Sequence, residues 1–292
     1  MTTLSEHQTF ATTNFSLSGA SGLYDRARPS YPAEAISLIL SKLPPNATVL
    51  ELGAGTGLFT RGLLTAAAEK GEGTIKKLRA IEPSEGMRKG FEKGLEAVGG
   101  RDADGKVNGI EVTVEDGTFE RIPAEEGEAD LVVIAQAFHW MGHNGSAAVN
   151  EIARVLKPQT GVWAKIWNLE NGDAAQWVAE LRNVYEEFEA GTPQYRHGYW
   201  KSIWKLEEFP QLFTAPEEHH VYTRTLPTNE DLVVDRAFSK SYITALSSED
   251  RAELEEKLRE IVRRGDGKEW IDEKEGTFHY PYATDLFLTT RK

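Results

Sequence analysis

The stretch VLELGAGTGLFT, Val49 to Thr60, decides the fold of this chain. Apolar and β-branched residues lead into Gly53-x-Gly55-x-Gly57, and an apolar segment that favours a helix follows at once. We therefore expect the three glycines to form the turn between a buried strand and a helix. Glycine permits positive φ there, and without a Cβ the backbone can approach a ligand while N–H groups of the new helix point toward it.

Strands and helices alternate along most of the chain. The helix after the glycine turn is followed by further strand-like segments, and the one at 129–135 is apolar on both faces, as a buried parallel strand should be. The expected strands are 48–52, 77–81, 110–114, 129–135, 161–167, 219–225 and 283–290, with Pro281 just before the paired part of the last one. This order predicts an α/β fold with a doubly wound parallel sheet and a ligand at the carboxyl ends of its strands.

Composition limits the possible classes of protein. A chain of 292 residues with 40% hydrophobic content can bury one large core and a modest cap. The net charge of −13 and the lack of a basic patch argue against nucleic acid or a membrane surface as partner. No segment is long and apolar enough to span a bilayer, residues 1–20 do not resemble a secretory signal, and cysteine is absent. We expect a cytoplasmic protein without a metal site.

The division into domains follows from where the periodic pattern begins and changes. Residues 1–22 are polar and aperiodic and are expected to be a flexible N-terminal tail. Residues 23–292 form the expected main domain, with 168–216 as an inserted substrate cap that is rich in aromatic residues. A later helix, opened by Ser247 or Ser248, is expected through Val262.

Glu82 ends the second expected strand and is the first candidate ligand residue. A carboxylate at this place can accept hydrogen bonds from both hydroxyls of a ribose. Its distance of 29 residues from Gly53 exceeds the usual ~20, which a longer helix and loop would explain. The plainer interpretation is a solvated acidic side chain at a helix N-terminus.

The segment YDRARPSYP, Tyr24 to Pro32, precedes the first strand. It is either an ordinary surface loop before a helix or a lid that folds over a bound cofactor. Its two tyrosines and two arginines favour the lid.

Four motifs in order resemble the class I S-adenosylmethionine-dependent methyltransferases over about residues 24–167. They are ELGAGTG, IEPSEGM, GTFERIP and LKPQTGVW. YDRARPSYP, AFHW and GYW look most like the small-molecule subgroup that includes trans-aconitate methyltransferase and related fungal enzymes. The resemblance implies a Rossmann-like sheet of seven strands, mostly parallel with the last strand antiparallel, a helical cap, and S-adenosylmethionine as cofactor.

The same resemblance implies cofactor-binding roles for a set of residues. Glu51 would meet the methionyl amine, the glycines would admit the methionyl and ribose parts, and Glu82 would hold the ribose hydroxyls. Many members have Asp-Ala where this chain has Thr118-Phe119, so the adenine contact could come from Asp116 instead. The full implied set is Tyr24, Glu51, Gly53, Gly55, Gly57, Glu82, Met87, Asp116, Thr118, Phe119, Ala135 and Gln136.

His139 and Arg28 are the candidate catalytic residues, and they separate two classes of acceptor. A carboxylate acceptor is already ionised at neutral pH and needs placement by a cation such as Arg28. A hydroxyl acceptor must lose its proton, and His139 is then the base; its plainer role is a hydrogen-bonded helix histidine. The carboxylate is slightly favoured. Candidate substrate-binding aromatic residues are Tyr31, Trp140, Tyr199 and Trp200.

Three alternatives to the transfer of a methyl group to a small molecule remain to be compared with the sequence. A nicotinamide oxidoreductase could use the glycine turn, but no tyrosine is followed by a lysine four residues later, as short-chain dehydrogenases require. Metal binding by His139 and His143 would need both on one helical face, and Gly142 and Asn144 favour a turn. A binding module without catalysis remains the third alternative. The sequence does not indicate the oligomeric state.

Overall fold

The computed structural model describes residues 9, 13, 20–71, 73–141, 145–189 and 191–292, without the side chains of residues 20, 21 and 24. Its sheet has eight strands in the order β3-β2-β1-β4-β5-β8-β6, with β7 paired to β8 off this path. The strands are β1 (Ala47–Leu52), β2 (Ile75–Ile81), β3 (Glu111–Glu115), β4 (Leu131–Ala135), β5 (Val162–Glu170), β6 (Glu218–Thr228), β7 (Trp270–Asp272) and β8 (Thr277–Thr290).

The first five strands are parallel, and β8 runs antiparallel to both β5 and β6. The predicted doubly wound, mostly parallel sheet with an antiparallel last strand is therefore confirmed. The short exposed strand β7 is the addition to the seven that were expected.

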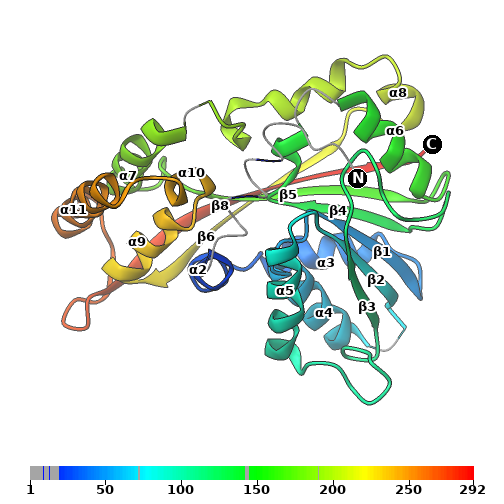
Figure 1. Cartoon of the computed structure of the whole chain (residues 1–292), viewed down its shortest axis with the longest axis horizontal. Helices are drawn as coiled ribbons and strands as arrows, with labels where there is room; N and C mark the ends of the chain where they lie inside the picture. The colour runs from blue at the N-terminus through cyan, green and yellow to red at the C-terminus, as the bar shows by residue number, and fades with distance from the viewer. Residues whose placement is uncertain (1–8, 10–12, 14–19, 72, 142–144, 190) are drawn as a thin grey trace.

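Two layers of helices cover the central sheet (Figure 1). One apolar core lies between the sheet and α3 (Ala33–Ser41), α4 (Leu58–Lys70) and α5 (Glu85–Gly94). The core on the other face includes η2 (Phe138–Met141), α6 (Gly145–Val155), η5 (Tyr199–Lys205) and α8 (Phe209–Leu212). These layers leave the carboxyl ends of the parallel strands as the place where a ligand can enter.

A third apolar core is formed by helices that lie beyond the central sheet. Helices α7 (Gln176–Glu186), α9 (Glu230–Phe238), α10 (Ser241–Thr244) and α11 (Ser248–Arg264) pack with the first half of β8. The predicted cap, 168–216, contains α7 with η3 (Glu187–Glu189), η4 (Tyr195–His197), η5 and α8, but α9 and α10 come from outside those bounds. The predicted α11 is present, and Ser247 Oγ caps it by accepting from the Asp250 N–H at 3.1 Å.

Pro281 lies inside β8, opposite Thr225 of β6, so its predicted place before the paired part of the strand is wrong. The last β5–β8 pair is Glu170 with Tyr282, one residue short of Pro281. The Pro281 carbonyl accepts from Asn171 just past the end of β5. In an antiparallel pair, the N–H and the C=O of one residue point toward the same neighbouring strand. Pro281 has no N–H, and the position where that N–H would point lies just past the end of β5. The sheet therefore loses no β5–β8 hydrogen bond at Pro281.

Helix α2 (Ala20–Ala27) begins inside the predicted tail 1–22, most of which lies outside the described residues. Asp25 of α2 pairs with Arg61 of α4 and accepts from Thr56 of the glycine turn at 3.1 Å. Arg26 pairs with Asp235 of α9 at 3.0 Å. Helix α2 therefore connects the glycine turn to the outer helices.

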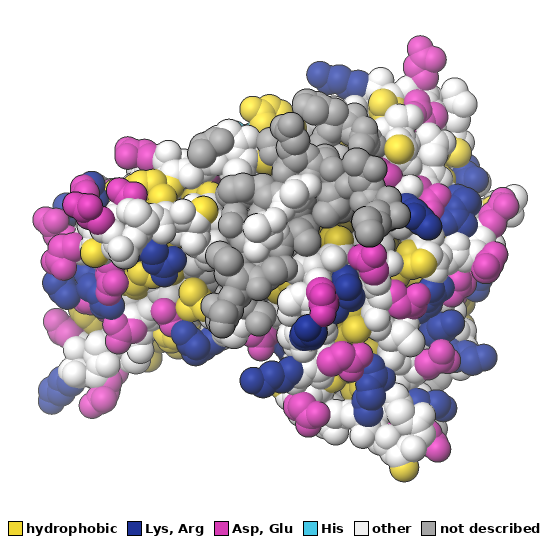
Figure 2. Space-filling view, viewed as in Figure 1, with side chains coloured by type: hydrophobic (Ala, Val, Ile, Leu, Met, Phe, Trp, Pro, Cys, Tyr) yellow, Lys and Arg dark blue, Asp and Glu magenta, His cyan; other side chains and the backbone are white. Residues whose placement is uncertain are grey.

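Acidic and basic side chains are interspersed over the described part of the face shown in Figure 2. Among the described helices, none has both the length and the apolar content needed to cross a bilayer.

Candidate active site

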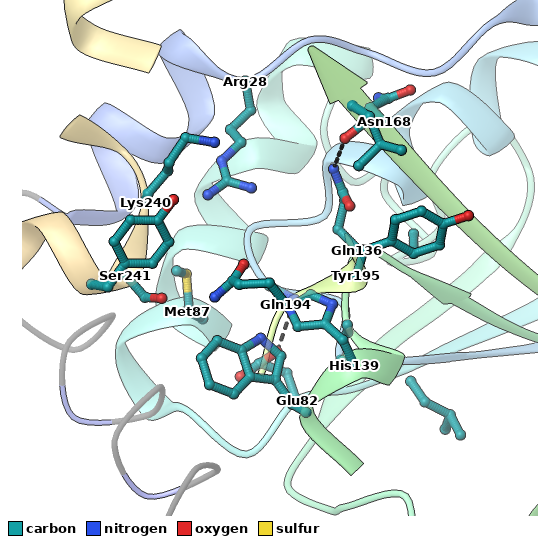
Figure 3. A pocket seen from close by; sticks show the side chains of 18 of the residues that line it. Arg28, Glu82, Met87, Gln136, His139, Asn168, Gln194, Tyr195, Lys240 and Ser241 are labelled. Carbon is teal, nitrogen blue, oxygen red and sulfur yellow. Dashed lines mark hydrogen bonds between the residues drawn. The ribbon is translucent and has the colours of Figure 1, made fainter. Parts of the chain in front are cut away.

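A cavity opens at the carboxyl ends of β1, β2, β4 and β5. Figure 3 shows side chains that line it, among them Glu82, Gln136, His139 and Lys240. The central sheet supplies one side of it through residues predicted from sequence. These are Gly53, Gly55, Glu82, Met87, Thr118, Phe119, Ala135, Gln136, His139 and Trp140. The structure therefore has a cavity at the carboxyl ends of the strands, where the strand order predicts a ligand.

The glycine turn approaches this cavity with two of its three glycines. Gly53 has φ 69° and donates to the Ile81 carbonyl at 2.7 Å, and a Cβ on it would lie 2.6 Å from the Ala137 Cβ. A Cβ on Gly55 would meet no atom within 4 Å, so this position faces open space. Gly57 does not line the cavity: its Cβ would collide with the Phe91 ring at 2.8 Å, so it is needed for packing.

Glu82 is buried at the end of β2, not solvated at the helix surface. Its Oε2 accepts from the Gly55 N–H at 2.9 Å and its Oε1 from the Ser84 N–H at 2.8 Å. Burial raises the pKa of this carboxyl, and the two backbone donors oppose that effect. Each oxygen keeps a second lone pair, so the group can still accept hydroxyl hydrogens from a ligand.

Glu51 lies deeper, beside a small adjoining cavity that Gly53, Ala135 and Gln136 also line. Its side chain is 1% exposed and accepts from the Thr60 hydroxyl. Burial raises the pKa of Glu51 to about 8, against the smaller effects of Thr60 and Arg61. A buried carboxyl of this kind is suited to a cationic ligand group, which would restore its charge.

Helix α5 brings Met87 to the cavity wall, and the loop after β3 brings Thr118 and Phe119. The Thr118 Oγ1 atom is buried and lacks a hydrogen-bond partner among the described residues. Asp116, the alternative adenine contact, is placed elsewhere: its side chain is 69% exposed and faces Arg88 at 3.3 Å. Tyr24 lies in α2, and its side chain is outside the described part of the chain.

The exit of β4 brings Gln136 and His139 to the cavity, where both contact residues of β5. Gln136 adopts a φ of 56°, unusual for a non-glycine residue, and its amide donates to the Asn168 carbonyl at 2.6 Å. The Trp167 indole N–H donates to His139 Nδ1 at 3.3 Å. Burial, with the positive charge of Arg28, lowers the pKa of His139 to about 3. This arrangement leaves Nε2 with the proton, so His139 can donate to a ligand and is a poor base.

The four aromatic candidates for substrate binding are placed differently. Trp140 lines the main cavity, and Tyr31 lines the small adjoining one, edge-on to Phe59. Tyr199 is 63% exposed and stacks on His197, so it lies at the surface. Trp200 is buried in the core behind Tyr195, to whose carbonyl it donates at 3.2 Å. The structure does not bring Tyr199 or Trp200 to the cavity.

The outer side of the cavity contains residues that sequence reasoning missed. It is strongly charged and comes from β5, α7, the η3–η4 region, α9 and α10. The residues are Asn168, Glu170, Arg182, Glu186, Glu189, Gln194, Tyr195, Arg196, Arg236, Lys240, Ser241 and Tyr242, beside the predicted Arg28. One available signal was Arg236, a cation on an otherwise apolar helical face. Among the described residues, no cluster of His, Asp and Glu could hold a metal ion.

Comparisons with known proteins agree with this geometry. Residues 50–163 match the family model described as a methyltransferase domain. An uncharacterized methyltransferase of Mycobacterium tuberculosis is 28% identical over 254 residues, which cover 85% of this chain and 86% of the relative. An uncharacterized methyltransferase-like protein of Schizosaccharomyces pombe is 26% identical over 246 residues, covering 82% and 83%.

Solved structures share the fold. The YcgJ protein of Bacillus subtilis has a TM-score of 0.51 at 14% identity, covering 89% of this chain and 98% of its own. A putative type II methyltransferase of Anaeromyxobacter dehalogenans has a TM-score of 0.54 at 17% identity, covering 89% and 97%. The matched domain and the relatives support an S-adenosylmethionine-dependent methyltransferase, and the glycine turn at the carboxyl ends of the strands agrees with that activity.

Proposed function

We propose that this enzyme transfers the methyl group of S-adenosylmethionine to a carboxylate oxygen of a small organic acceptor. The observation that carries this proposal is the charge of the outer half of the cavity. Five cations, Arg28, Arg182, Arg196, Arg236 and Lys240, face three carboxylates there, Glu170, Glu186 and Glu189. When Lys240 is protonated, these cations exceed the carboxylates by two within a chain of net charge −13, which favours an anionic acceptor.

The inner half of the cavity suits the cofactor in several ways. In this proposal Glu82 would hold the ribose hydroxyls, and Glu51 would meet the methionyl amine. A Cβ on Gly55 would meet no atom within 4 Å, so the backbone there leaves open space for the cofactor. Thr118 Oγ1, buried and without a partner among the described residues, is the kind of atom that an adenine edge could satisfy.

The chemistry needs little from the protein beyond placement. When bound, the cofactor supplies a sulfonium methyl group: a carboxylate oxygen forms the new C–O bond, the C–S bond breaks, and its electron pair stays on sulfur. No proton must leave, so a base is not required. The chain's own residues hold the acceptor by charge, through Arg28, and exclude water.

Transfer to a hydroxyl was the alternative, with His139 as base. The low pKa of His139 and the Trp167 N–H on its Nδ1 atom both weigh against it. Membership of the subgroup that resembles trans-aconitate methyltransferase, a cap role for 168–216 and a cytoplasmic location remain parts of this proposal.

Isothermal titration tests the cofactor, and labelled methyl transfer tests the acceptor. S-adenosylmethionine should bind more tightly than NADH. Glu82→Ala should weaken its binding by about 1.5–3 kcal/mol, the range for hydrogen bonds to a charged group. The surface variant Glu85→Ala is the matched control, because that side chain is 71% exposed.

With the methyl group of the cofactor labelled, the product formed from a library of small acids should release the label as methanol in mild base, as carboxyl esters do. A label that resists base would indicate an ether or amine product and contradict the carboxylate proposal. Tighter binding of NADH would contradict the whole assignment.

A further inference from the structure

Lys240 and Arg236 share a single counter-ion at the outer wall of the cavity. Lys240 Nζ lies 3.0 Å from Glu170 Oε1, and an Arg236 guanidinium nitrogen lies 2.8 Å from the same oxygen. All three side chains are largely buried, at 12%, 4% and 6% exposed. One carboxylate thus faces two cations that have little access to water.

Lys240 and Arg236 together carry more N–H donors than the Glu170 carboxylate can accept. The Lys240 ammonium has three N–H groups. Among the described residues its contacts are the hydrogen bond to Glu170 and the face of the Tyr185 ring, 4.3 Å away. Arg236 Nε is buried and has no partner within the described part of the chain. Buried N–H groups normally find acceptors, so this wall of the cavity is suited to a ligand that brings one.

Arg28 adds a third cation to this part of the cavity. Its guanidinium is held by the Ser239 hydroxyl at 3.2 Å and the Ser239 carbonyl at 3.0 Å. In Figure 3 the Lys240 amine is directed toward Arg28, whose guanidinium reaches into the cavity. An acidic group in this space would be near both cations.

We propose that Lys240 is, with Arg28, the anion-binding pair of the acceptor site, and that an acidic group of the acceptor lies beside the Lys240 ammonium. This inference rests on the proposed function and deepens it. It assigns Lys240 the role of a specificity residue that selects acids over neutral acceptors.

The proton on Lys240 gives the proposal a distinct signature. Burial, and then the positive charge of Arg236, lower the pKa of Lys240 to about 7; Arg28 acts in the same direction, and Glu170 opposes it. The titratable groups that line this part of the cavity come from six elements and from Arg28. They are Glu170 on β5, Arg182 and Glu186 on α7, Glu189 on η3, Tyr195 and Arg196 on η4, Arg236 on α9, Tyr242 on α10, and Arg28; Tyr185 of α7 adds the ring contact. An anion should favour the charged amine, so binding should be accompanied by proton uptake above pH 7.

The experiment uses enzyme saturated with S-adenosylhomocysteine, and binding of that compound is measured first. Acetate, malonate and succinate are then titrated by calorimetry at pH 6 and 8.5, beside acetamide, malonamide and succinamide. The variants are Lys240→Arg and Lys240→Met. Lys257→Met is the control, because Lys257 is an exposed residue of α11, 54% accessible. Melting temperatures and cofactor affinity confirm that each variant folds.

At least one carboxylate should bind wild-type enzyme, and its amide should not. Its affinity should fall tenfold or more between pH 6 and 8.5. Lys240→Arg should keep the affinity and lose most of this pH dependence, since arginine stays charged. Lys240→Met should lose tenfold or more at pH 6, and Lys257→Met should match wild type.

Three results would overturn the proposal. They are carboxylate affinity unchanged in Lys240→Met, equal pH dependence in Lys240→Arg and wild type, and no carboxylate binding to enzyme that holds the cofactor product. A fourth is loss of affinity in Lys240→Arg equal to that in Lys240→Met, because the retained positive charge would then not hold the carboxylate. Failure of S-adenosylhomocysteine to bind would contradict the proposed function. Because its binding is measured first, that result is distinct from a failure of the Lys240 proposal.

Discussion

The Trp167 indole N–H donates to Nδ1 of His139, so the histidine that follows β4 is held by a tryptophan of β5. Indole nitrogen is only a donor, which fixes Nδ1 as an acceptor and Nε2 as the protonated atom of the neutral ring. The contact thereby turns a candidate base into a hydrogen-bond donor at the cavity.

His139 should therefore stay neutral across the working pH range. Its pKa of about 3 results from burial and the nearby charge of Arg28, so its ring signals in NMR should not titrate between pH 5 and 8. His139→Gln, which keeps an N–H donor, should retain much more turnover than His139→Ala. A general base would be indicated if turnover falls about 10²–10⁴-fold in both variants and the His139 ring titrates near pH 6.5. That result would show that the donor role is wrong.

Glu51 should take part in cofactor binding through its proton. Its pKa of about 8 means that most molecules carry a neutral carboxyl at pH 7, whereas a bound ammonium group would favour the carboxylate. Calorimetry in buffers of different ionisation enthalpy should detect proton release on binding at pH 7. Glu51→Gln should abolish that release, and an unchanged proton count would separate Glu51 from the cofactor.

The same shift predicts a pH dependence of stability. The folded pKa of Glu51 lies above the ordinary 4.5, so its stabilising effect is complete below about pH 4.5 and is lost as pH rises toward 8. The free energy of unfolding of wild type should fall relative to Glu51→Gln by up to about 1.4 kcal/mol per pH unit in that window. Urea unfolding from pH 5 to 9 measures the free energy of unfolding of both proteins. The contributions of the other titrating groups are the same in both and cancel in the difference.

Gly53 and Gly55 should respond differently to alanine. Both have positive φ, which costs a side chain about 1–2 kcal/mol, but only the Cβ at Gly53 would collide, at 2.6 Å from Ala137. Gly53→Ala should therefore lower the melting temperature more than Gly55→Ala. Gly55→Ala should instead weaken cofactor binding in a protein that remains folded. Equal cofactor affinity in Gly55→Ala and wild type would show that the open space at Gly55 is not used.

The parts of the site that sequence predicted are those formed by local pattern. The glycine turn, Glu82 and the strand order depend on short-range geometry, so the motifs place Gly53, Gly55 and Glu82 in the cavity. The sequence predicts Trp200 in the substrate pocket, whereas its side chain packs in the core against Trp167. An aromatic residue after a polar loop can turn to either place, and only tertiary packing determines which. Lys240 and Arg236 were missed because their meeting with Glu170 joins segments about 70 residues apart.

The segment that contains Arg28 should become more ordered when the cofactor binds. Asp25 contacts Thr56 in the glycine turn, and the Asn168 amide donates to the Ser30 carbonyl at 2.9 Å, so the segment is fastened on both sides of the cavity. Hydrogen exchange of residues 22–31 should slow on addition of S-adenosylmethionine. Exchange that is equal in the free and bound enzyme would identify this segment as an ordinary loop.

Arg28 is the residue whose removal best separates the two classes of acceptor. For a carboxylate acceptor, Arg28→Ala should raise KM tenfold or more while kcat and cofactor affinity change little, because the lost interaction holds the acceptor in both ground and transition states. Arg26→Ala is the matched control: it is two residues away in the same segment, is 61% exposed and pairs with Asp235 of α9. It should leave KM near the wild-type value. A hydroxyl acceptor whose turnover collapses in His139→Ala, while Arg28→Ala behaves as wild type, would reverse the preference for carboxylates.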